Sequence, residues 1–160
     1  MRLFTRLAAV FAPLVLCACP HDAPSEPASV PNLVTNGSFN AAIEGVAWSA
    51  EGNVSVVQRE GNVTVVAVSP TYTITLNLGH ATNVGDYPLN LPAILGPSAS
   101  LTHASGARWA TGTIDATGLV TLSTLSASRI AGTFAFAGLS VTGGVVSFAH
   151  VTRGTFDVTY

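Results

Sequence analysis

The chain has 160 residues, of which 9% are charged, and its formal net charge at pH 7 is −2. Lysine is absent, and the arginines beyond residue 6 are scattered along the sequence at Arg59, Arg108, Arg129 and Arg153. Nucleic-acid binding depends on clustered cationic side chains that neutralise phosphates, so this composition argues against a nucleic-acid partner.

Residues 1–18 have the organisation of a secretory signal peptide. A short basic region at residues 1–6 precedes an apolar run over residues 7–16, which is interrupted once, by Pro13. A membrane-spanning helix needs roughly 20 apolar residues, so this run is too short to remain as an anchor. We therefore expect these residues to be removed on export.

The end of the apolar run resembles the bacterial lipobox, in which a leucine and two small residues precede the cysteine that receives the lipid. Leu16, Cys17, Ala18 and Cys19 match this order at Cys19, whereas Cys17 has the bulky Val15 and Leu16 before it. We predict that Cys19 is lipidated and tied to a bacterial envelope membrane, with the outer membrane favoured over the inner one. The alternative is an ordinary cleaved signal in which the two cysteines occur by chance.

A linker is expected between the lipid anchor and the folded region. Residues 20–31 contain four prolines among alanine, serine, glutamate and aspartate, and they lack an apolar period. We interpret residues 19–35 as the lipidated cysteine and a flexible linker. Residues 36–160 then form a single β-domain, a size within the ~100–150 residues typical of one domain.

Short segments that alternate apolar and polar residues fill the rest of the chain, and glycine-containing turns separate them. In chain order they lie at residues 36–43, 46–50, 54–57, 63–66, 72–78, 85–89, 99–103, 107–114, 119–122, 128–139 and 151–160. Pro88 confines its segment to a sheet edge or a strand start, and no helical period follows residue 30. The sequence predicts an all-β fold, an antiparallel β-sandwich or partly open barrel of about 8–11 short strands.

Two phenylalanine-rich segments give the clearest core signal. In residues 128–139, Phe134 and Phe136 share one parity of the alternation, and in residues 151–160 Phe156 shares a parity with the other large apolar residues. Side chains of one parity point to one face of a strand. We expect both segments to face a common hydrophobic layer.

Three groups of residues carry a resemblance to a known family. They are residues 36–39 (Asn-Gly-Ser-Phe) with 44–50 (Glu-Gly-Val-Ala-Trp-Ser-Ala), then Gly85, Tyr87 and Leu89, and finally Gly118, Val120 and Leu122 with residues 129–136 (Arg-Ile-x-Gly-Thr-Phe-x-Phe) and 151–156 (Val-Thr-x-Gly-Thr-Phe). In this order they resemble a family of small bacterial lipoproteins with a domain of unknown function. The resemblance implies an all-β module displayed from an envelope membrane, and it brings no catalytic residues.

Aromatic side chains are the candidate ligand-binding residues, because exposed rings stack on sugars or fill peptide pockets. We select Trp109, Tyr72 and Tyr87, and we expect Trp48 to belong to the core.

Metal-dependent and nucleophilic chemistry have little support in the sequence. His80, His103, His150, Asp86 and Asp115 are the candidate metal ligands, but zinc sites usually show paired ligands at short spacing, and none occurs here. A Gly-x-Ser-x-Gly nucleophile motif is also absent. We expect no metal and no cofactor, and we assign no catalytic residue.

Two hypotheses for the function follow. The first is a lipid-anchored envelope module without catalytic activity, which binds a carbohydrate or protein ligand or serves a structural role. The second is an envelope hydrolase that acts on polysaccharide through paired carboxylates, because such pairs are defined by their separation in space and not by sequence. The acids available for such a pair are Glu44, Glu51, Glu60, Asp86, Asp115 and Asp157.

Overall fold

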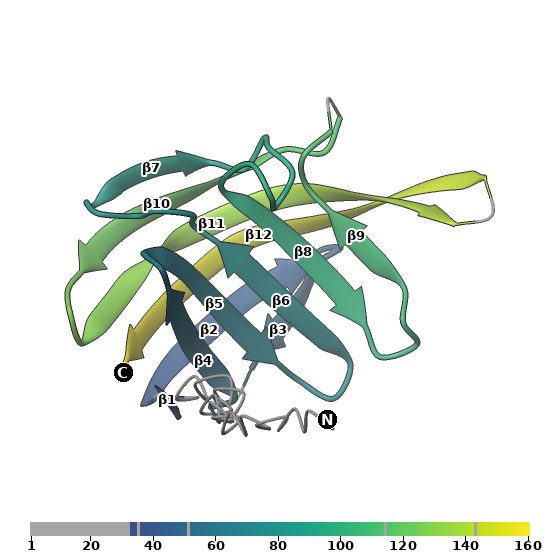
Figure 1. Ribbon diagram of the computed structural model, residues 1–160. Coiled ribbons are helices and arrows are strands. Elements are labelled where there is room, and N and C mark those ends of the chain that lie inside the picture. Colours follow the sequence, from purple (N-terminus) through teal and green to yellow (C-terminus); the bar gives the residue numbers. More distant parts are fainter. Residues whose placement is uncertain (1–32, 35, 51, 114, 143) are drawn as a thin grey trace, which may run out of the picture.

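The computed structural model describes residues 33–34, 36–50, 52–113, 115–142 and 144–160 (Figure 1). These residues form twelve strands and no helix, which confirms the predicted all-β class. None of them therefore belongs to a helix that is long and apolar enough to cross a membrane. The predicted signal peptide and the predicted lipidation site at Cys19 lie outside the described residues.

The strands follow one another through short connections. In chain order they are β1 Leu33–Val34, β2 Asn36–Ile43, β3 Val46–Ser49, β4 Val54–Arg59, β5 Asn62–Val68, β6 Tyr72–Asn77, β7 Gly85–Pro88, β8 Ser98–His103, β9 Arg108–Ala110, β10 Gly118–Leu125, β11 Arg129–Thr142 and β12 Val145–Thr159.

All strand pairs are antiparallel, and they form one sheet that curls into a half-barrel (Figure 1). The order across the sheet is β1-β4-β5-β6-β8-β9-β11-β12-β2-β3, while β10 pairs with β11, and β7 pairs with β10. β11 joins two parts of the curl: its first half pairs with β10, and Leu139 in its second half pairs with Ala110 of β9. β7 has a single partner, as the position of Pro88 predicts.

β11 and β12 are longer than the sequence segments that predicted them, because the residues on either side of their shared turn continue both strands. Irregularities in register occur between Phe134 and Phe136 and between Thr152 and Thr155. Arg153 adopts a φ of 53° at the second irregularity. Such bulges let a long strand bend with the curl of the sheet while its buried face stays inward.

The core fills the inner face of the curl, and phenylalanine rings form its centre. The ring of Phe39 on β2 lies 4.9 Å from that of Phe134 and 5.9 Å from that of Phe156. All three side chains are at least 96% buried, which confirms that the two phenylalanine-rich segments face one layer. Gly154 lies opposite Phe134, where a Cβ atom would come within 2.5 Å of the ring. A side chain at this position would therefore push the ring out of place.

Two side-chain hydrogen bonds connect strands that are distant in the sheet order. Trp48 Nε1 on β3 donates to Ser69 Oγ after β5 at 2.8 Å, and Gln58 Nε2 on β4 donates to Tyr160 Oη at 2.8 Å. The half-buried Trp48 ring also packs edge-on against Phe39, with the ring centres 6.0 Å apart. Trp48 therefore lies at the margin of the core.

Candidate functional site

A groove of about 720 Å³ lies between the outer face of β4, β5 and β6 and the loop of residues 93–97. Its floor includes Val57, Thr64 and Asn77, which are cross-strand neighbours on three successive strands. These residues alternate with buried ones, so their side chains point away from the core. The groove is thus built on the face of the sheet opposite the phenylalanine layer.

The side chain of Asn77 holds the loop that forms one wall of the groove. Its Nδ2 atom donates to the carbonyl of Ala93 at 3.1 Å, and its Oδ1 atom accepts a hydrogen bond from the Gly79 N–H at 3.0 Å. Within the loop, Ile94 is 90% exposed and Leu95 is 69% exposed. The fixed loop therefore presents two aliphatic side chains to solvent along the groove.

Polar side chains gather at the hairpin that joins β4 to β5. Glu60 and Gly61 form its two-residue turn with φ values of 49° and 82°, the signs that a type I′ turn requires. A Cβ atom on Gly61 would come within 2.9 Å of His80 Nδ1, so the imidazole lies against the turn. Arg59 and Asn62 flank the same turn and line the groove together with His80.

The guanidinium of Arg59 has no carboxylate partner in the described part of the chain. The carboxylates that lie close to basic side chains there are Asp157, beside Arg129, and Glu44, beside His150. An exposed guanidinium presents several N–H donors that match a carboxylate or phosphate. Arg59, Asn62 and His80 can therefore bind an anionic group at this end of the groove.

The three aromatic residues selected from the sequence do not come together. Tyr87 lines the groove, and its hydroxyl donates to the carbonyl of Asn83 at 2.6 Å. Tyr72 and Trp109 lie on the inner face of the sheet, on the two strands that flank β8.

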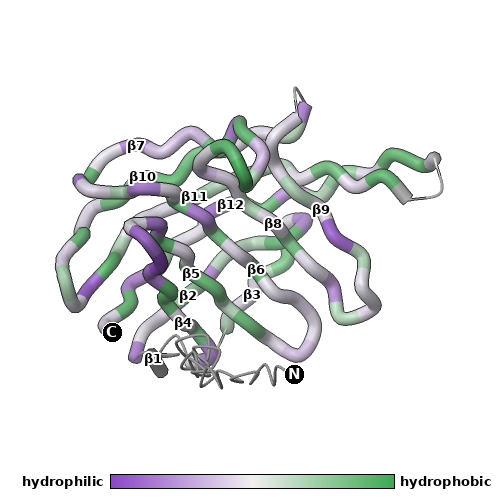
Figure 2. Tube along the Cα trace, in the orientation of Figure 1, coloured by the Kyte–Doolittle hydropathy of each residue, from purple (hydrophilic) through white to green (hydrophobic). Residues whose placement is uncertain are grey.

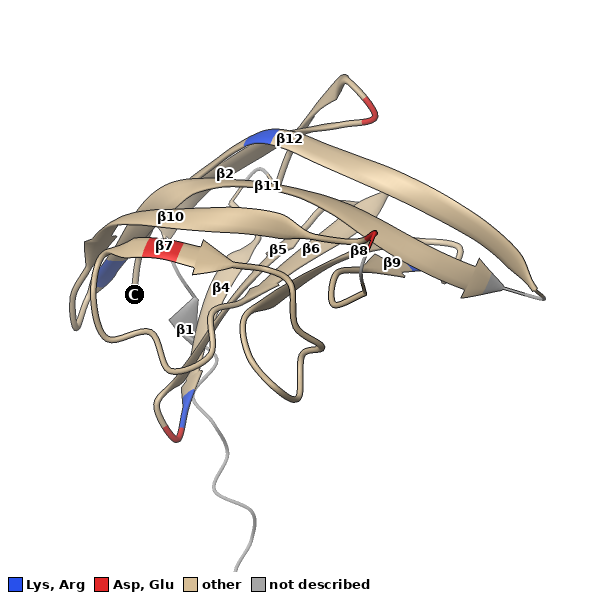
Figure 3. Ribbon diagram, turned by 90° about the horizontal axis from the view of Figure 1, so that it is seen from above, with Lys and Arg blue, Asp and Glu red and all other residues tan. Residues whose placement is uncertain are grey.

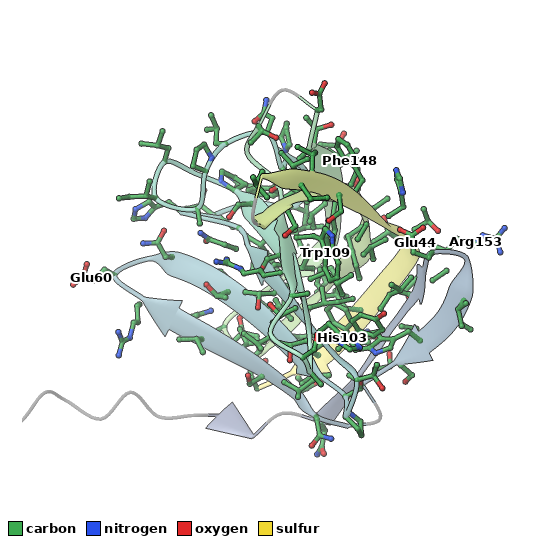
Figure 4. The ribbon with its side chains drawn as sticks, turned by 90° about the vertical axis from the view of Figure 1, so that its right-hand side faces the viewer. Glu44, Glu60, His103, Trp109, Phe148 and Arg153 are labelled. Carbon is green, nitrogen blue, oxygen red and sulfur yellow. The ribbon has the colours of Figure 1, made fainter. Side chains whose placement is uncertain are left out.

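Both of these inner aromatic side chains contact neighbouring residues. The Tyr72 ring lies 5.0 Å from the ring of His103. The indole N–H of Trp109 donates to Ser147 Oγ at 3.0 Å. Figure 4 shows Trp109 and His103 at the side of the molecule where β11 and β12 extend outward.

The histidines of the domain lie in separate surroundings. His80 rests on the β4–β5 turn, His103 Nδ1 is 2.7 Å from Ser105 Oγ, and His150 Nδ1 is 3.5 Å from Glu44 Oε1. Among the residues that the structure describes, no group of three or more histidine, cysteine, aspartate or glutamate side chains could hold a metal ion.

The carboxylates are also dispersed, and Figure 3 shows charged residues scattered over the molecule. Asp86 accepts a hydrogen bond from Thr121 Oγ1 at 2.7 Å. Asp157 accepts two from Arg129, at 2.9 and 2.7 Å, and this hydrogen bonding lowers the pKa of Asp157. Glu44 pairs with a histidine, so these three acids have different partners and lie on different elements.

Sequence reasoning missed most of the groove. It treated His80 only as a metal ligand and did not select Arg59, Asn62 or Ile94 as site residues. One available signal was the aliphatic pair Ile94 and Leu95, which lies in a proline-flanked loop and belongs to no predicted strand. The other signal was Arg59 beside a tight turn. The local sequence pattern does not show that the loop docks over β6.

Comparison with known proteins adds one finding. A family model described as Domain of unknown function (DUF6252) matches residues 35–158. No curated protein and no solved structure matches the chain. The matched range begins just before β2 and ends within β12, so it covers the curled sheet and the groove on its outer face.

Proposed function

The chain belongs to the DUF6252 family, and from this premise we propose that it is a lipid-anchored envelope module that binds a protein ligand and has no catalytic activity. The observation that carries the proposal is the groove, which combines an arginine without an ion-pair partner among the described residues with exposed aliphatic side chains. This combination fits a peptide segment with one acidic group and one apolar side chain.

The two ends of the groove support different parts of this ligand. Arg59 and His80 provide donors for a carboxylate. Ile94 is 90% exposed on a loop that is held in place by Asn77, so a ligand can cover the isoleucine without a rearrangement of the loop.

A peptide suits the lining better than a sugar does. Sugar binding commonly uses the open face of an aromatic ring. Within the described lining, Tyr87 is the one aromatic residue, its side chain is half-buried, and its hydroxyl already donates to Asn83. Aliphatic contacts and a guanidinium therefore dominate the surface that a ligand would meet.

Site-specific photo-crosslinking in cells tests the groove. A photoreactive residue at position 94 should form a defined adduct with another protein, and Arg59→Gln should reduce its yield. The matched control is the same residue at Val46, which is 70% exposed on β3, away from the groove. Equal adduct patterns from positions 94 and 46 would contradict a ligand site in the groove.

Membrane partition tests the anchor. The Cys19→Ala chain should move from the membrane fraction to the soluble fraction, because the thiol that would receive the lipid is gone. Cys17→Ala is the matched control and should stay with the membrane, since Cys17 is not in the position of the lipid-accepting cysteine. Membrane association of the Cys19→Ala chain at the wild-type level would refute lipid anchoring at this residue.

A further inference from the structure

The outer edge of β12 lacks a partner strand in the described structure between its turn and His150. β2 pairs with β12 only as far as Val151, opposite Ile43. The ladder ends one residue further, where the Glu44 N–H donates to the His150 carbonyl and Glu44 Oε1 accepts from the His150 N–H. Backbone groups alternate sides along an antiparallel strand, so those of Val146 and Phe148 point to the same open edge as those of His150.

We define residues 138–142 and 144–149 as the distal hairpin, which extends beyond the body of the half-barrel (Figure 1). One face of this hairpin is apolar, because Leu139 lies opposite Phe148 and Val141 lies opposite Val146. Val141 is 64% exposed, Val146 56% and Phe148 45%. Figure 2 shows hydrophobic stretches along the projecting strands.

The opposite face of the distal hairpin, which carries Ser140 and Ser147, is turned toward the inside of the curl. Ser140 lies opposite Ser147, and Ser147 Oγ accepts the hydrogen bond from Trp109. In Figure 4, Phe148 and Trp109 lie on different sides of the β11–β12 ribbon. The apolar face is therefore on the outer surface, where the described structure provides nothing to cover it.

The open edge also lacks the features that keep sheet edges apart. Edge strands are commonly protected by charged side chains, prolines or bulges. β7, which pairs on one side only, carries Asp86 and Pro88, whereas residues 138–149 contain no charged residue and no proline. Figure 3 shows the distal hairpin free of acidic and basic residues.

We propose that this edge is a dimer interface, in which β12 pairs antiparallel with β12 of a second copy of the chain. A two-fold axis at Ser147 places Val146 opposite Phe148 of the second copy, and Phe148 opposite Val146 of that copy. The two pairs form about four backbone hydrogen bonds. The same geometry joins the two apolar faces into one continuous surface.

Three observations favour a second copy over other occupants. A lipid surface cannot satisfy the outward N–H and C=O groups of Val146 and Phe148. The described chain begins at β1, which lies on the far side of the molecule from this edge in Figure 1. When an uncharged strand pairs with a second copy of itself, no like charges come to lie opposite each other, so self-pairing is not opposed by repulsion.

Sedimentation of the intact full-length chain in detergent tests the interface through a matched pair of variants. Val146→Glu places a charge on the edge strand between the two copies, whereas Val141→Glu places the same charge on the same face one strand away from the edge. Val146→Pro removes an outward N–H without loss of a β11–β12 hydrogen bond. We expect a wild-type dimer whose dissociation constant rises about tenfold or more in both Val146 variants and little in Val141→Glu.

The outcomes separate this proposal from its competitors. Far-UV circular dichroism shows whether each variant folds. If Val146→Pro does not fold, the comparison of Val146→Glu with Val141→Glu still tests the interface. A monomeric wild type at about 100 μM overturns the proposal, since that concentration exceeds the dissociation constant of a specific dimer. Equal dissociation of Val141→Glu and Val146→Glu also overturns it, because the apolar face and not the edge would then make the contact.

A lipid occupant has its own outcome. In a Cys19→Ala background, where no acyl chain on residue 19 contributes, flotation with phosphatidylglycerol vesicles measures lipid binding by the hairpin itself. Vesicle binding that both glutamate variants abolish would overturn the dimer in favour of a membrane surface. Absence of vesicle binding together with a wild-type dimer supports the strand-pairing interface.

Discussion

The two ends of the β11–β12 pair have the same alternation of residues and opposite environments. At one end Phe134 and Phe156 are 4% and 3% exposed, and at the other end Phe148 is 45% exposed. The buried rings point into the curl toward Phe39, whereas Phe148 points to the outer face of the distal hairpin. Alternation assigns side chains to a face, but neighbouring strands decide whether that face is covered.

The strands beside each end explain this difference. β10 pairs with β11 at residues 130–136, and β2 pairs with β12 at residues 151–159, so the phenylalanine-rich end lies within the sheet. The distal hairpin extends past both neighbours and meets β9 at a single pair, Leu139 with Ala110. Val141, Val146 and Phe148 on its outer face remain exposed, whereas Ala149 at its base is buried in the core.

The largest expected effect compares alanine substitutions at the two ends. Phe134→Ala should lower the free energy of unfolding by about 3–5 kcal/mol, because it leaves a cavity among packed rings. Phe148→Ala should change it by less than about 1 kcal/mol in dilute solution, because the side chain is largely exposed. Urea unfolding followed by tryptophan fluorescence measures both values. Similar losses for the two variants would show that Phe148 is buried in the folded chain.

A smaller and more local effect is expected at Trp109. Trp109→Phe removes the indole N–H that donates to Ser147 and should weaken the attachment of the distal hairpin by about 1 kcal/mol. Faster amide exchange at residues 144–148 with unchanged exchange at residues 130–136 would show this effect. Trp48→Phe removes the comparable bond to Ser69 and is the control. If it accelerated exchange in the distal hairpin equally, the specific role of Trp109 would be refuted.

The smallest expected effect concerns the Arg129–Asp157 ion pair at the phenylalanine-rich end of β11 and β12. The hydrogen bonds from Arg129 lower the pKa of Asp157, so the folded chain holds this carboxylate ionised to a lower pH than the unfolded chain does. The stabilisation is present above the ordinary pKa near 3.8 and is lost as pH falls through the lower folded value. Both side chains are about half exposed, with 52% and 47% of their surfaces accessible, so the contribution is small.

Asp157→Asn tests this linkage through urea midpoints measured between pH 7 and pH 2. The difference between wild type and variant should shrink as the pH falls below the ordinary pKa of aspartate. A difference that stays constant over this range would show that the carboxylate charge does not contribute.

Local patterns were sufficient to predict most of the strands. Alternation over residues 72–78 predicted β6, Pro88 predicted an edge strand, and glycine-containing turns predicted the breaks between strands, as at Gly45 and Gly61. These signals are local, because side-chain direction and turn conformation depend on a few adjacent residues. The sequence left a sandwich and a partly open barrel open, and the single curled sheet matches the partly open barrel.

Long-range pairing and the groove were beyond this reasoning. Nothing in residues 36–43 indicates that they pair with residues 151–159, and the function of Gly154 becomes clear only once Phe134 is placed opposite it. The aromatic candidates failed to group for a related reason. All three pack against the core, and parity could not say that Tyr87 alone of them would also line the groove.

The position of β12 between β11 and β2 has a consequence for biosynthesis. Glu44 and its partner His150 are 106 residues apart, so the ribosome has made most of this domain before β2 can pair with β12. Domains dominated by such distant pairings fold slowly. The phenylalanine layer should therefore assemble only after synthesis of β12, because Phe156 lies on this strand and packs against Phe39 of β2.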